Sequence, residues 1–344
     1  MIEVLAIADD MTGAAEAGAK FAQAGIPAIL GWECAGGATD GRVVVIDSET
    51  RHATAAAAYE QVFACARLFT SRITYKKTDS TLRGNIGAEL RALSDARPSA
   101  RIAYVPAYPA LGRTVRDGLL LVDGVPLHET TFAADPLNPV TDSRVRRVLD
   151  GGLPCDVFDA STDAEIDAIA ADILSSGRYS IVAGPAAIAG ALAVHLQGSS
   201  AAREPWPKID TCLVVNGSMH PASARQVSFA ENQRAIGESL PWRIHKIDAA
   251  SVDPLALARV NGATVRDLLA GERYHAVMVF GGDTAFGILE AFGLPLVRPL
   301  GELLPGVAIS RVDRQDWFLI TKAGGFGGED LIRRIRTELN GVIY

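Results

Sequence analysis

Several charged and hydrogen-bonding side chains in the stretch YKKTDSTLRGN directly follow a short apolar run. Lys77 and Arg83 supply positive charge, and a planar guanidinium can hold a carboxylate through two parallel hydrogen bonds. Asp79 and Ser80 add an acid and a hydroxyl between them. This combination favours a site for a small acid. A structural interpretation is also open, in which Asp79 or Ser80 caps a helix and Lys76 points into solvent.

A pair of aspartates, Asp9 and Asp10, follows the first apolar run of the chain in the stretch IADDMTG. Adjacent carboxylates at a strand end are unfavourable unless cations or hydrogen-bond donors face them, and a reacting hydroxyl is one such donor. Asp10 is therefore a candidate general base. Asp10 or Thr12 could instead cap the first helix, because both residue types accept hydrogen bonds from free amides.

Glycine-rich turns in the second half of the chain favour phosphate binding. Gly281 and Gly282 precede Asp283 and Thr284 in VFGGDTAFG, where an apolar run gives way to a helical pattern. Glycines let the backbone approach a ligand, and a helix N-terminus offers amide donors and a favourable dipole to phosphate. Asp283 would hold magnesium, directly or through water. A glycine pair at a strand end is also common without any ligand.

Two more loops of this half carry similar chemistry. Gly324 and Gly325 lie in KAGGFGGED, which follows the apolar run WFLI. Ser218 and His220 follow TCLVVNG, and His220 is the one histidine that this placement favours for a functional role.

Short apolar, β-branched runs alternate with helical patterns through most of the chain. This alternation is typical of parallel sheets covered by helices on both faces. At 344 residues the chain is longer than one core usually serves. We therefore expect an α/β fold of two domains, each a mainly parallel sheet flanked by helices, with a cleft between them. The Gly-, Ser-, Ala- and Pro-rich stretch 197–212 suggests a linker, with domains at 1–204 and 205–344.

The polar residues described above all fall where apolar runs end. In open α/β sheets, ligands bind beyond the carboxyl ends of the strands. The proline-containing stretch 104–160 is expected to be irregular and to wall a site, because long loops in compact domains tend to be functional. Thr162 and Glu165 have capping-box spacing and predict a scaffold helix.

Composition excludes several classes of protein. The formal charge is −7 and no basic stripe is present, which argues against a nucleic-acid partner. No segment approaches the roughly 20 apolar residues that span a bilayer, and the N-terminus lacks the pattern of a signal peptide. The four widely spaced cysteines are expected to be reduced thiols of a cytoplasmic protein. The absence of a Walker A motif and of a complete GxGxxG argues against a P-loop kinase and weakens an NAD-binding interpretation.

These stretches, taken in order, resemble the four-carbon acid sugar kinase family. IADDMTGAAEAG, YKKTDSTLRGN and VPAYPALGRTVRDG are similar to its N-terminal signatures. NGSMHPASARQV, GGDTAFGILEAFG and KAGGFGGED are similar to its nucleotide-binding segments. The resemblance implies an N-terminal domain that binds a sugar acid such as threonate, erythronate or 3-oxo-tetronate. It also implies a C-terminal domain that binds ATP, whose γ-phosphate is transferred to a hydroxyl of the acid.

The resemblance also assigns residues to the two ligands. On the substrate side it implies Asp9, Asp10, Lys77, Asp79, Ser80 and Arg83. On the ATP side it implies Ser218, Gly281, Gly282, Asp283, Thr284 and Gly324, next to His220 and Gly325. In the chemistry we expect, Lys77 and Arg83 hold the carboxylate and magnesium lies near Asp283. Asp10 or Asp79 acts as the base. Gly325 stands where asparagine is common in the family, so the nucleotide contact implied at this position departs from the family pattern.

Two other functions compete with a kinase. An NAD-dependent hydroxy-acid dehydrogenase would use a similar carboxylate clamp, and a non-catalytic sensor of sugar acids would bind without consuming ATP. The sequence allows a homodimer and does not specify the oligomeric state, the acid or the hydroxyl that is phosphorylated.

Overall fold

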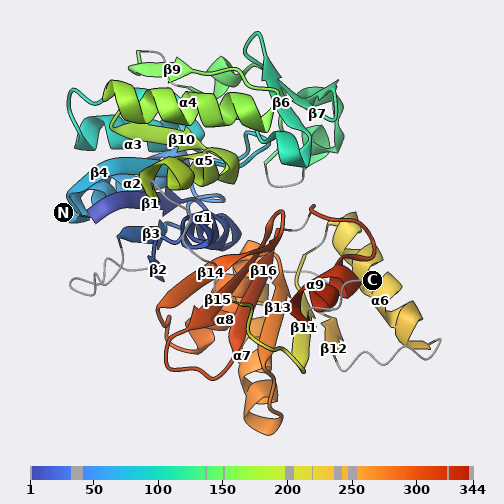
Figure 1. Ribbon diagram of the computed structural model, residues 1–344. Coiled ribbons are helices and arrows are strands. Elements are labelled where there is room, and N and C mark those ends of the chain that lie inside the picture. Colours follow the sequence, from blue (N-terminus) through green and yellow to red (C-terminus); the bar gives the residue numbers. More distant parts are fainter. Residues whose placement is uncertain are drawn as a thin grey trace. The chain divides into compact units, whose positions relative to one another are not determined.

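The chain forms two compact units, Met1–Ala202 and Arg203–Tyr344, each with its own sheet and helices (Figure 1). Part of the expected linker, residues 198–204, lies outside the described residues. The computed structural model describes residues 2–31, 42–135, 138–149, 152–197, 205–218, 220–235, 242–246, 254–323 and 325–340.

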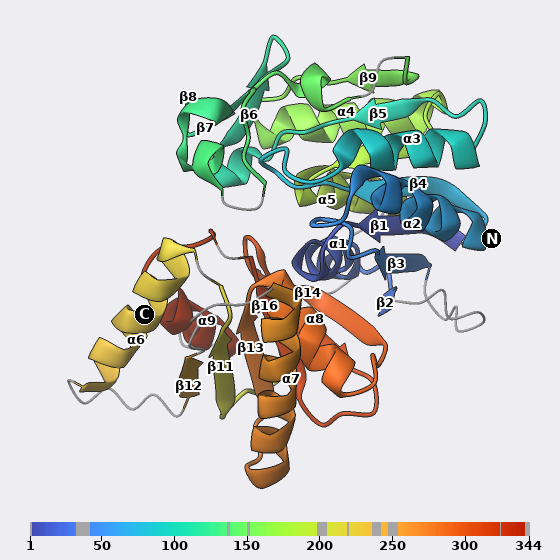
Figure 2. The same cartoon turned by 180° about the vertical axis from the view of Figure 1, so that it is seen from behind.

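The N-terminal unit is built on a parallel sheet in the strand order β2-β3-β1-β4-β10-β5-β9. Helices α1, α4 and α5 pack on one face, and α2 and α3 pack on the other (Figures 1 and 2). The elements are β1 (Ile2–Ala8), α1 (Met11–Gln23), β2 (Ala28–Gly31), β3 (Val43–Asp47), α2 (Ala55–Leu68), β4 (Ser71–Lys77), α3 (Ile86–Ala96), β5 (Ile102–Tyr104), β9 (Cys155–Val157), α4 (Asp163–Ser176), β10 (Ile181–Gly184) and α5 (Ala186–Gln197).

The carboxyl ends of the central strands lie at one edge of this sheet. Ala8 of β1 is opposite Asp47 of β3 on one side and Lys77 of β4 on the other. Lys77 is in turn opposite Gly184 of β10. The chain passes from β3 across β1 to β4, so the strand order reverses beside β1, which is where open α/β sheets bind ligands.

The stretch 104–160 is more ordered than the sequence analysis expected. It contains an antiparallel sheet of β6 (Arg113–Arg116), β7 (Leu119–Val122) and β8 (Val125–Pro126), followed by short 3-10 turns. Two Asp-Gly pairs connect these strands with positive φ angles. The angles are 53° at Asp117 and 71° at Gly118, and 51° at Asp123 and 82° at Gly124. Asp-Gly pairs favour such tight hairpin turns, so the expectation of an irregular stretch was wrong for these residues.

The C-terminal unit has the strand order β12-β11-β13-β16-β15-β14. Strands β12, β11, β13 and β16 are parallel, whereas β15 runs antiparallel to both β16 and β14. Helices α6 and α9 pack together, and α7 packs against α8 (Figure 2). The elements are β11 (Cys212–Asn216), α6 (Pro221–Ala235), β12 (Trp242–Lys246), α7 (Pro254–Gly271), β13 (Ala276–Phe280), α8 (Gly282–Ala291), β14 (Val297–Leu304), β15 (Val307–Val312), β16 (Phe318–Lys322) and α9 (Leu331–Asn340).

Local signals of the sequence explain individual elements. The capping box of α4 is confirmed: Thr162 Oγ1 accepts from Glu165 N at 3.2 Å, and Glu165 Oε2 accepts from Thr162 N at 3.0 Å. Cys65, Cys155 and Cys212 are free thiols, and Cys34 lies outside the described residues. Within the ranges described above, none of the helices is long and apolar enough to cross a bilayer.

Candidate functional site

Acidic side chains at the carboxyl edge of the N-terminal sheet converge on Arg51, which follows β3. Its Nη2 donates to Asp9 Oδ1 at 2.9 Å, and its Nε pairs with the other oxygen of Asp9. Its guanidinium also lies 3.3 Å from Asp10 Oδ1 and 3.5 Å from Asp79 Oδ1. Burial alone would lower the pKa of Arg51, but the surrounding negative charges raise it well above its usual value. Arg51 therefore stays charged and holds the acids together.

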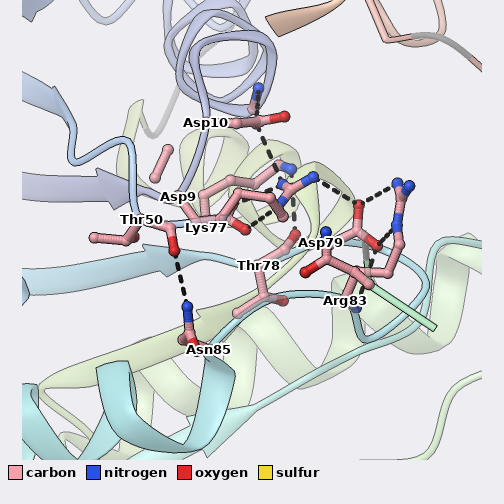
Figure 3. Close-up of polar contacts among 12 residues, drawn as sticks. Asp9, Asp10, Thr50, Lys77, Thr78, Asp79, Arg83 and Asn85 are labelled. Atoms are coloured by element: carbon pink, nitrogen blue, oxygen red, sulfur yellow. Dashed lines mark hydrogen bonds and ion pairs between the residues drawn. The ribbon is translucent and has the colours of Figure 1, made fainter. Parts of the chain in front are cut away.

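Arg51 was not among the residues predicted from the sequence. Its place after the apolar run RVVVID, in the stretch DSETR, is the same kind of strand end that drew attention to Asp9 and Lys77. The backbone fixes it there, because Arg51 N and Thr50 N both donate to Asp9 O at 3.0 Å. Asn85 Nδ2 donates to Thr50 O at 2.9 Å and thereby ties the same loop to the start of α3 (Figure 3).

Asp10 is the N-cap of α1. Its Oδ1 accepts from Gly13 N at 2.8 Å, and its Oδ2 accepts from the Thr12 hydroxyl at 3.0 Å. The capping interpretation is therefore confirmed for Asp10. Its side chain remains 16% exposed while that of Asp9 is 1% exposed, so Asp10 is the more accessible of the pair.

Asp79 is surrounded by hydrogen-bond donors. Arg83 donates to it in a bidentate manner, through Nε at 3.0 Å and Nη2 at 2.9 Å, and Thr81 N donates at 2.9 Å (Figure 3). Burial acts to raise the pKa of Asp79, but Arg83 and Arg51 together hold it well below its usual value. Asp79 is thus a firmly ionised partner of two arginines.

Arg83 bridges two acids of the unit. Its Nη1 donates to Asp135 at 3.0 Å, in addition to the two contacts with Asp79. Its guanidinium also lies 5.5 Å from the centre of the Phe132 ring. A guanidinium has five N–H donors, so these contacts leave donor capacity on an Arg83 side chain that is 26% exposed.

The two lysines of YKKTDSTLRGN point to opposite faces of the sheet, because successive side chains of a strand alternate. Lys76 is fully buried and its Nζ lies 3.1 Å from Glu89 Oε2 of α3, so the alternative interpretation in which it points into solvent is wrong. Lys77 Nζ donates to Thr78 O at 3.2 Å and lies 3.5 Å from Glu16 Oε2 of α1. A β-carbon at Gly13 would lie 3.1 Å from Lys77 Nζ and 2.7 Å from Asp10 Oδ1, which places this ammonium beside Asp10.

Asp47 is an acid of this edge that the sequence analysis missed. It is buried at the end of β3, and its Oδ1 accepts from Glu49 N at 3.1 Å. Among the described residues its Oδ2 has no hydrogen-bond partner. Burial, and then the negative charges of Asp10 and Asp9, raise the pKa of Asp47 to about 7. Ser80, also predicted here, is buried in the loop after β4.

The predicted nucleotide residues gather at the carboxyl edge of the C-terminal sheet. Backbone bonds join the loops there, from Gly217 N to Phe280 O and from Gly281 N to Lys322 O, each at 3.1 Å. Gly281 has a φ of 109°, and α8 begins at the next residue with Asp283 in its first turn and Thr284 buried. A β-carbon at Gly217 would overlap Thr284 Oγ1, so the first loop needs glycine to pack against α8.

Ser218 and His220 organise the start of α6. Ser218 Oγ accepts from His220 N at 3.2 Å, and His220 Nδ1 accepts from Ala222 N at 3.2 Å. A β-carbon at Gly325 would lie 3.3 Å from His220 Nε2, so the last glycine-rich loop reaches this histidine. Gly324 lies outside the described residues.

Asp283 has the carboxylate chemistry that a magnesium ion requires. Across the described ranges no cluster of three or more histidine, cysteine, aspartate or glutamate side chains could enclose a metal ion. Magnesium at phosphate-transfer sites is usually held by one or two carboxylates together with the phosphates. A single carboxylate in the first turn of α8 therefore fits such an ion when ATP is bound.

Two family models match different parts of the chain. Residues 4–154 match the model of a sugar-binding N-terminal domain, and residues 243–332 match that of a nucleotide-binding C-terminal domain. A D-threonate kinase from Cupriavidus necator is 30% identical and covers 94% of this chain and 95% of its own. The chain belongs to the four-carbon acid sugar kinase family.

Other members of the family match over similar lengths. The D-threonate kinase of Salmonella typhimurium is 27% identical over 96% of this chain and 97% of its own. The 3-oxo-tetronate kinase of Pectobacterium atrosepticum is 26% identical over 98% of this chain and 99% of its own.

Solved structures share the fold. A crystal structure of a Salmonella typhimurium protein covers 98% of this chain and 100% of its own, with a TM-score of 0.78 and 21% identity. A Bordetella bronchiseptica protein, described as a domain-swapped dimer with bound citrate, covers 98% of both chains, with a TM-score of 0.53 and 26% identity.

Proposed function

We propose that this chain is an ATP-dependent kinase that phosphorylates a hydroxyl of a four-carbon sugar acid such as threonate, erythronate or 3-oxo-tetronate. The observation that carries the proposal is the match to relatives named D-threonate kinase and 3-oxo-tetronate kinase over at least 94% of the chain. We assign the sugar acid to residues 1–204 and the nucleotide to residues 205–344.

In the N-terminal unit, Lys77 and Arg83 would bind the carboxylate of the acid, with Asp9 and Ser80 also on the substrate side. Arg83 already donates to Asp135 through Nη1. Because Asp135 has a side chain that is 20% exposed, we propose that the substrate carboxylate takes its place on Arg83. The hydrogen bonds from Arg83 to Asp79 use Nε and Nη2, so they would orient the guanidinium and leave Nη1 for the substrate carboxylate.

Asp10 is our candidate for the group that orients or deprotonates the attacking hydroxyl. It is 16% exposed and lies beside Lys77 Nζ. Asp79, the other candidate from sequence, accepts from Arg83 and Thr81, and its pKa is held well below the usual value. A carboxylate with such a low pKa is a weak proton acceptor, so we favour Asp10 as base and Asp79 as the partner of Arg83.

In the C-terminal unit, backbone amides at Gly281 and Gly282, with Ser218, His220, Thr284, Gly324 and Gly325, would bind ATP. We propose that Asp283 holds Mg²⁺. When bound, ATP with magnesium supplies the phosphoryl group and neutralises the charge that develops on it. The residues of this chain position the acid, the hydroxyl and the phosphates.

Two broader properties complete the proposal. A homodimer is compatible with the domain-swapped dimer described for the Bordetella bronchiseptica protein. We also propose that the enzyme works in the cytoplasm, where ATP is available.

A screen of ATP consumption tests the function. The chain is incubated with ATP, magnesium and a panel of four- and five-carbon sugar acids, and ADP release is followed. At least one four-carbon acid is expected to stimulate ADP release. If no acid does so while one raises the melting temperature, the chain is a sensor of sugar acids and the kinase proposal is wrong.

A further inference from the structure

A buried lysine at the end of β16 connects this strand to helix α6. Lys322 is fully buried, and its Nζ donates to Gln226 Oε1 at 2.7 Å and to Ser223 Oγ at 3.1 Å. The ammonium also lies 4.6 Å from the centre of the Phe280 ring. A lysine that precedes a glycine-rich loop would suggest a direct contact with phosphate, but this one is directed at the inner side of α6.

Gln226 continues the connection from Lys322 to the glycine-rich loop. It is fully buried, and its Nε2 donates to Phe326 O at 2.8 Å and to Gly327 O at 2.9 Å. The opposite orientation of the amide would place its oxygen against these two carbonyls, which is unfavourable because none of the three oxygens can donate. The two carbonyls fix the orientation of the Gln226 amide, and Lys322 Nζ donates to the oxygen that this orientation turns toward it.

The loop that Gln226 holds is tightly constrained. Gly327 has a φ of +84°, and a β-carbon there would lie 2.8 Å from Leu331 Cδ1. Gly325 lies against the His220 ring, because a β-carbon added at Gly325 would be 3.3 Å from His220 Nε2. The bonds from Gln226 to residues 326 and 327 thus keep this loop next to the one that carries Ser218 and His220.

We propose that Lys322 and Gln226 are positioning residues for the nucleotide, which act by holding the loop at 325–327 in the conformation that receives ATP. This inference rests on the proposed function, since it gives a role to buried residues beneath the loops that we propose bind ATP. Neither side chain touches the nucleotide. Their contribution is the preorganisation of backbone groups that would otherwise have to be ordered when ATP binds.

The test is nucleotide affinity, measured by calorimetry with ADP and magnesium on the full chain. In Gln226→Glu the carboxylate still accepts from Lys322, but its second oxygen faces the two carbonyls without a donor, so the melting temperature should fall while the chain stays folded. The carboxylate cannot donate to the two carbonyls, and we expect the Kd for ADP to rise about tenfold or more. The KM for the sugar acid should change by no more than about twofold, a split that a general loss of structure would not produce.

Arg225→Ala is the matched control. Arg225 precedes Gln226 on α6 and pairs with Glu329 at 3.5 Å, but both side chains of that ion pair are exposed. Exposed pairs contribute little, so this variant should bind ADP within about twofold of the wild type. Gln226→Met, which also lacks the N–H donors, should weaken ADP binding as Gln226→Glu does and gives a second test if the glutamate variant is unstable.

Wild-type affinity for ADP in a folded Gln226→Glu or Gln226→Met variant would overturn the inference and leave the kinase proposal standing. A wild-type chain that binds neither ATP nor ADP would overturn the proposed function, and this inference with it.

Discussion

Aspartates that look alike in the sequence differ sharply in their surroundings. Asp79 is ionised between Arg83 and Arg51, Asp10 caps a helix and is partly exposed, and Asp47 is buried with a raised pKa. The sequence could predict that Asp9, Asp10 and Asp79 follow strands. It could not assign them chemical roles, because the roles depend on Arg51, which reaches them from another strand end.

Replacing Asp10 by asparagine tests the choice of base. Asparagine caps helices about as well as aspartate, so α1 and the melting temperature should be nearly unchanged. The amide cannot accept the proton, and we expect kcat to fall by about 10²- to 10⁴-fold with little change in the KM for the acid. Steady-state kinetics decide this point. A variant with normal kcat and a raised KM would reverse the assignment.

Arg83 and Asp135 form a matched pair for carboxylate binding. Arg83→Ala removes the proposed clamp and should raise the KM for the sugar acid by roughly 10- to 100-fold, with little effect on the KM for ATP. Asp135→Asn weakens the group that we expect the substrate to displace from Arg83. Its KM for the acid should therefore be equal to or below that of the wild type. A rise in that KM would contradict displacement of Asp135.

Asp47 makes stability depend on pH. Its pKa is raised from 3.8 to about 7 by burial and by the charges of Asp10 and Asp9, so the folded chain holds a proton that the unfolded chain has lost. The contribution is fully present below about pH 4 and is lost as the pH rises through about 7. In Asp47→Asn this loss should be absent, and the melting temperature of the variant relative to the wild type should rise between about pH 5 and about pH 8. Parallel melting curves for both proteins would show that Asp47 does not hold this proton.

At the scale of elements, the strand ends explain why residues far apart in sequence meet. Parallel pairing sets Ala8, Asp47, Lys77 and Gly184 at one edge. The alternating pattern of apolar runs and helices was sufficient to predict that strand ends meet there, but not that Asp47 is among the residues of the edge. The burial of Lys76 was also accessible in principle, since a central strand covered on both faces leaves no solvent side. The identity of its partner, Glu89, could not be predicted, because Glu89 lies on a helix whose orientation on the sheet depends on packing.

The C-terminal loops depend on the close approach of backbone to α8. In Gly217→Ala the added methyl would overlap Thr284 Oγ1 and displace the start of α8. We expect the KM for ATP to rise about tenfold, with a smaller change in the KM for the acid. Gly271→Ala is the control, because a β-carbon at the end of α7 meets nothing within 4 Å. Equal nucleotide affinity in both variants would contradict the role given to this loop.

At the scale of the whole molecule, the class of fold followed from the alternation of apolar runs and helical patterns, and the family from the order of motifs along the chain. The hairpins within residues 104–160 did not, although their Asp-Gly turns are present in the sequence, because the prolines of this stretch favour an irregular loop. The antiparallel β15 was missed as well, since its apolar pattern resembles that of its parallel neighbours. The roles of Arg51, Lys322 and Gln226 required the three-dimensional contacts. Lys322 and Gln226 lie within KAGGFGGED and NGSMHPASARQV, but these stretches do not show that the two side chains meet.

The central claim is transfer of a phosphoryl group from ATP to a hydroxyl of a four-carbon acid. The most direct measurement is phosphorus NMR of a reaction containing the chain, ATP, magnesium and the acid that most stimulates ADP release. The account predicts a phosphate ester of that acid in an amount equal to the ADP formed. ADP accompanied only by inorganic phosphate, or no ADP with any four-carbon acid, would contradict it.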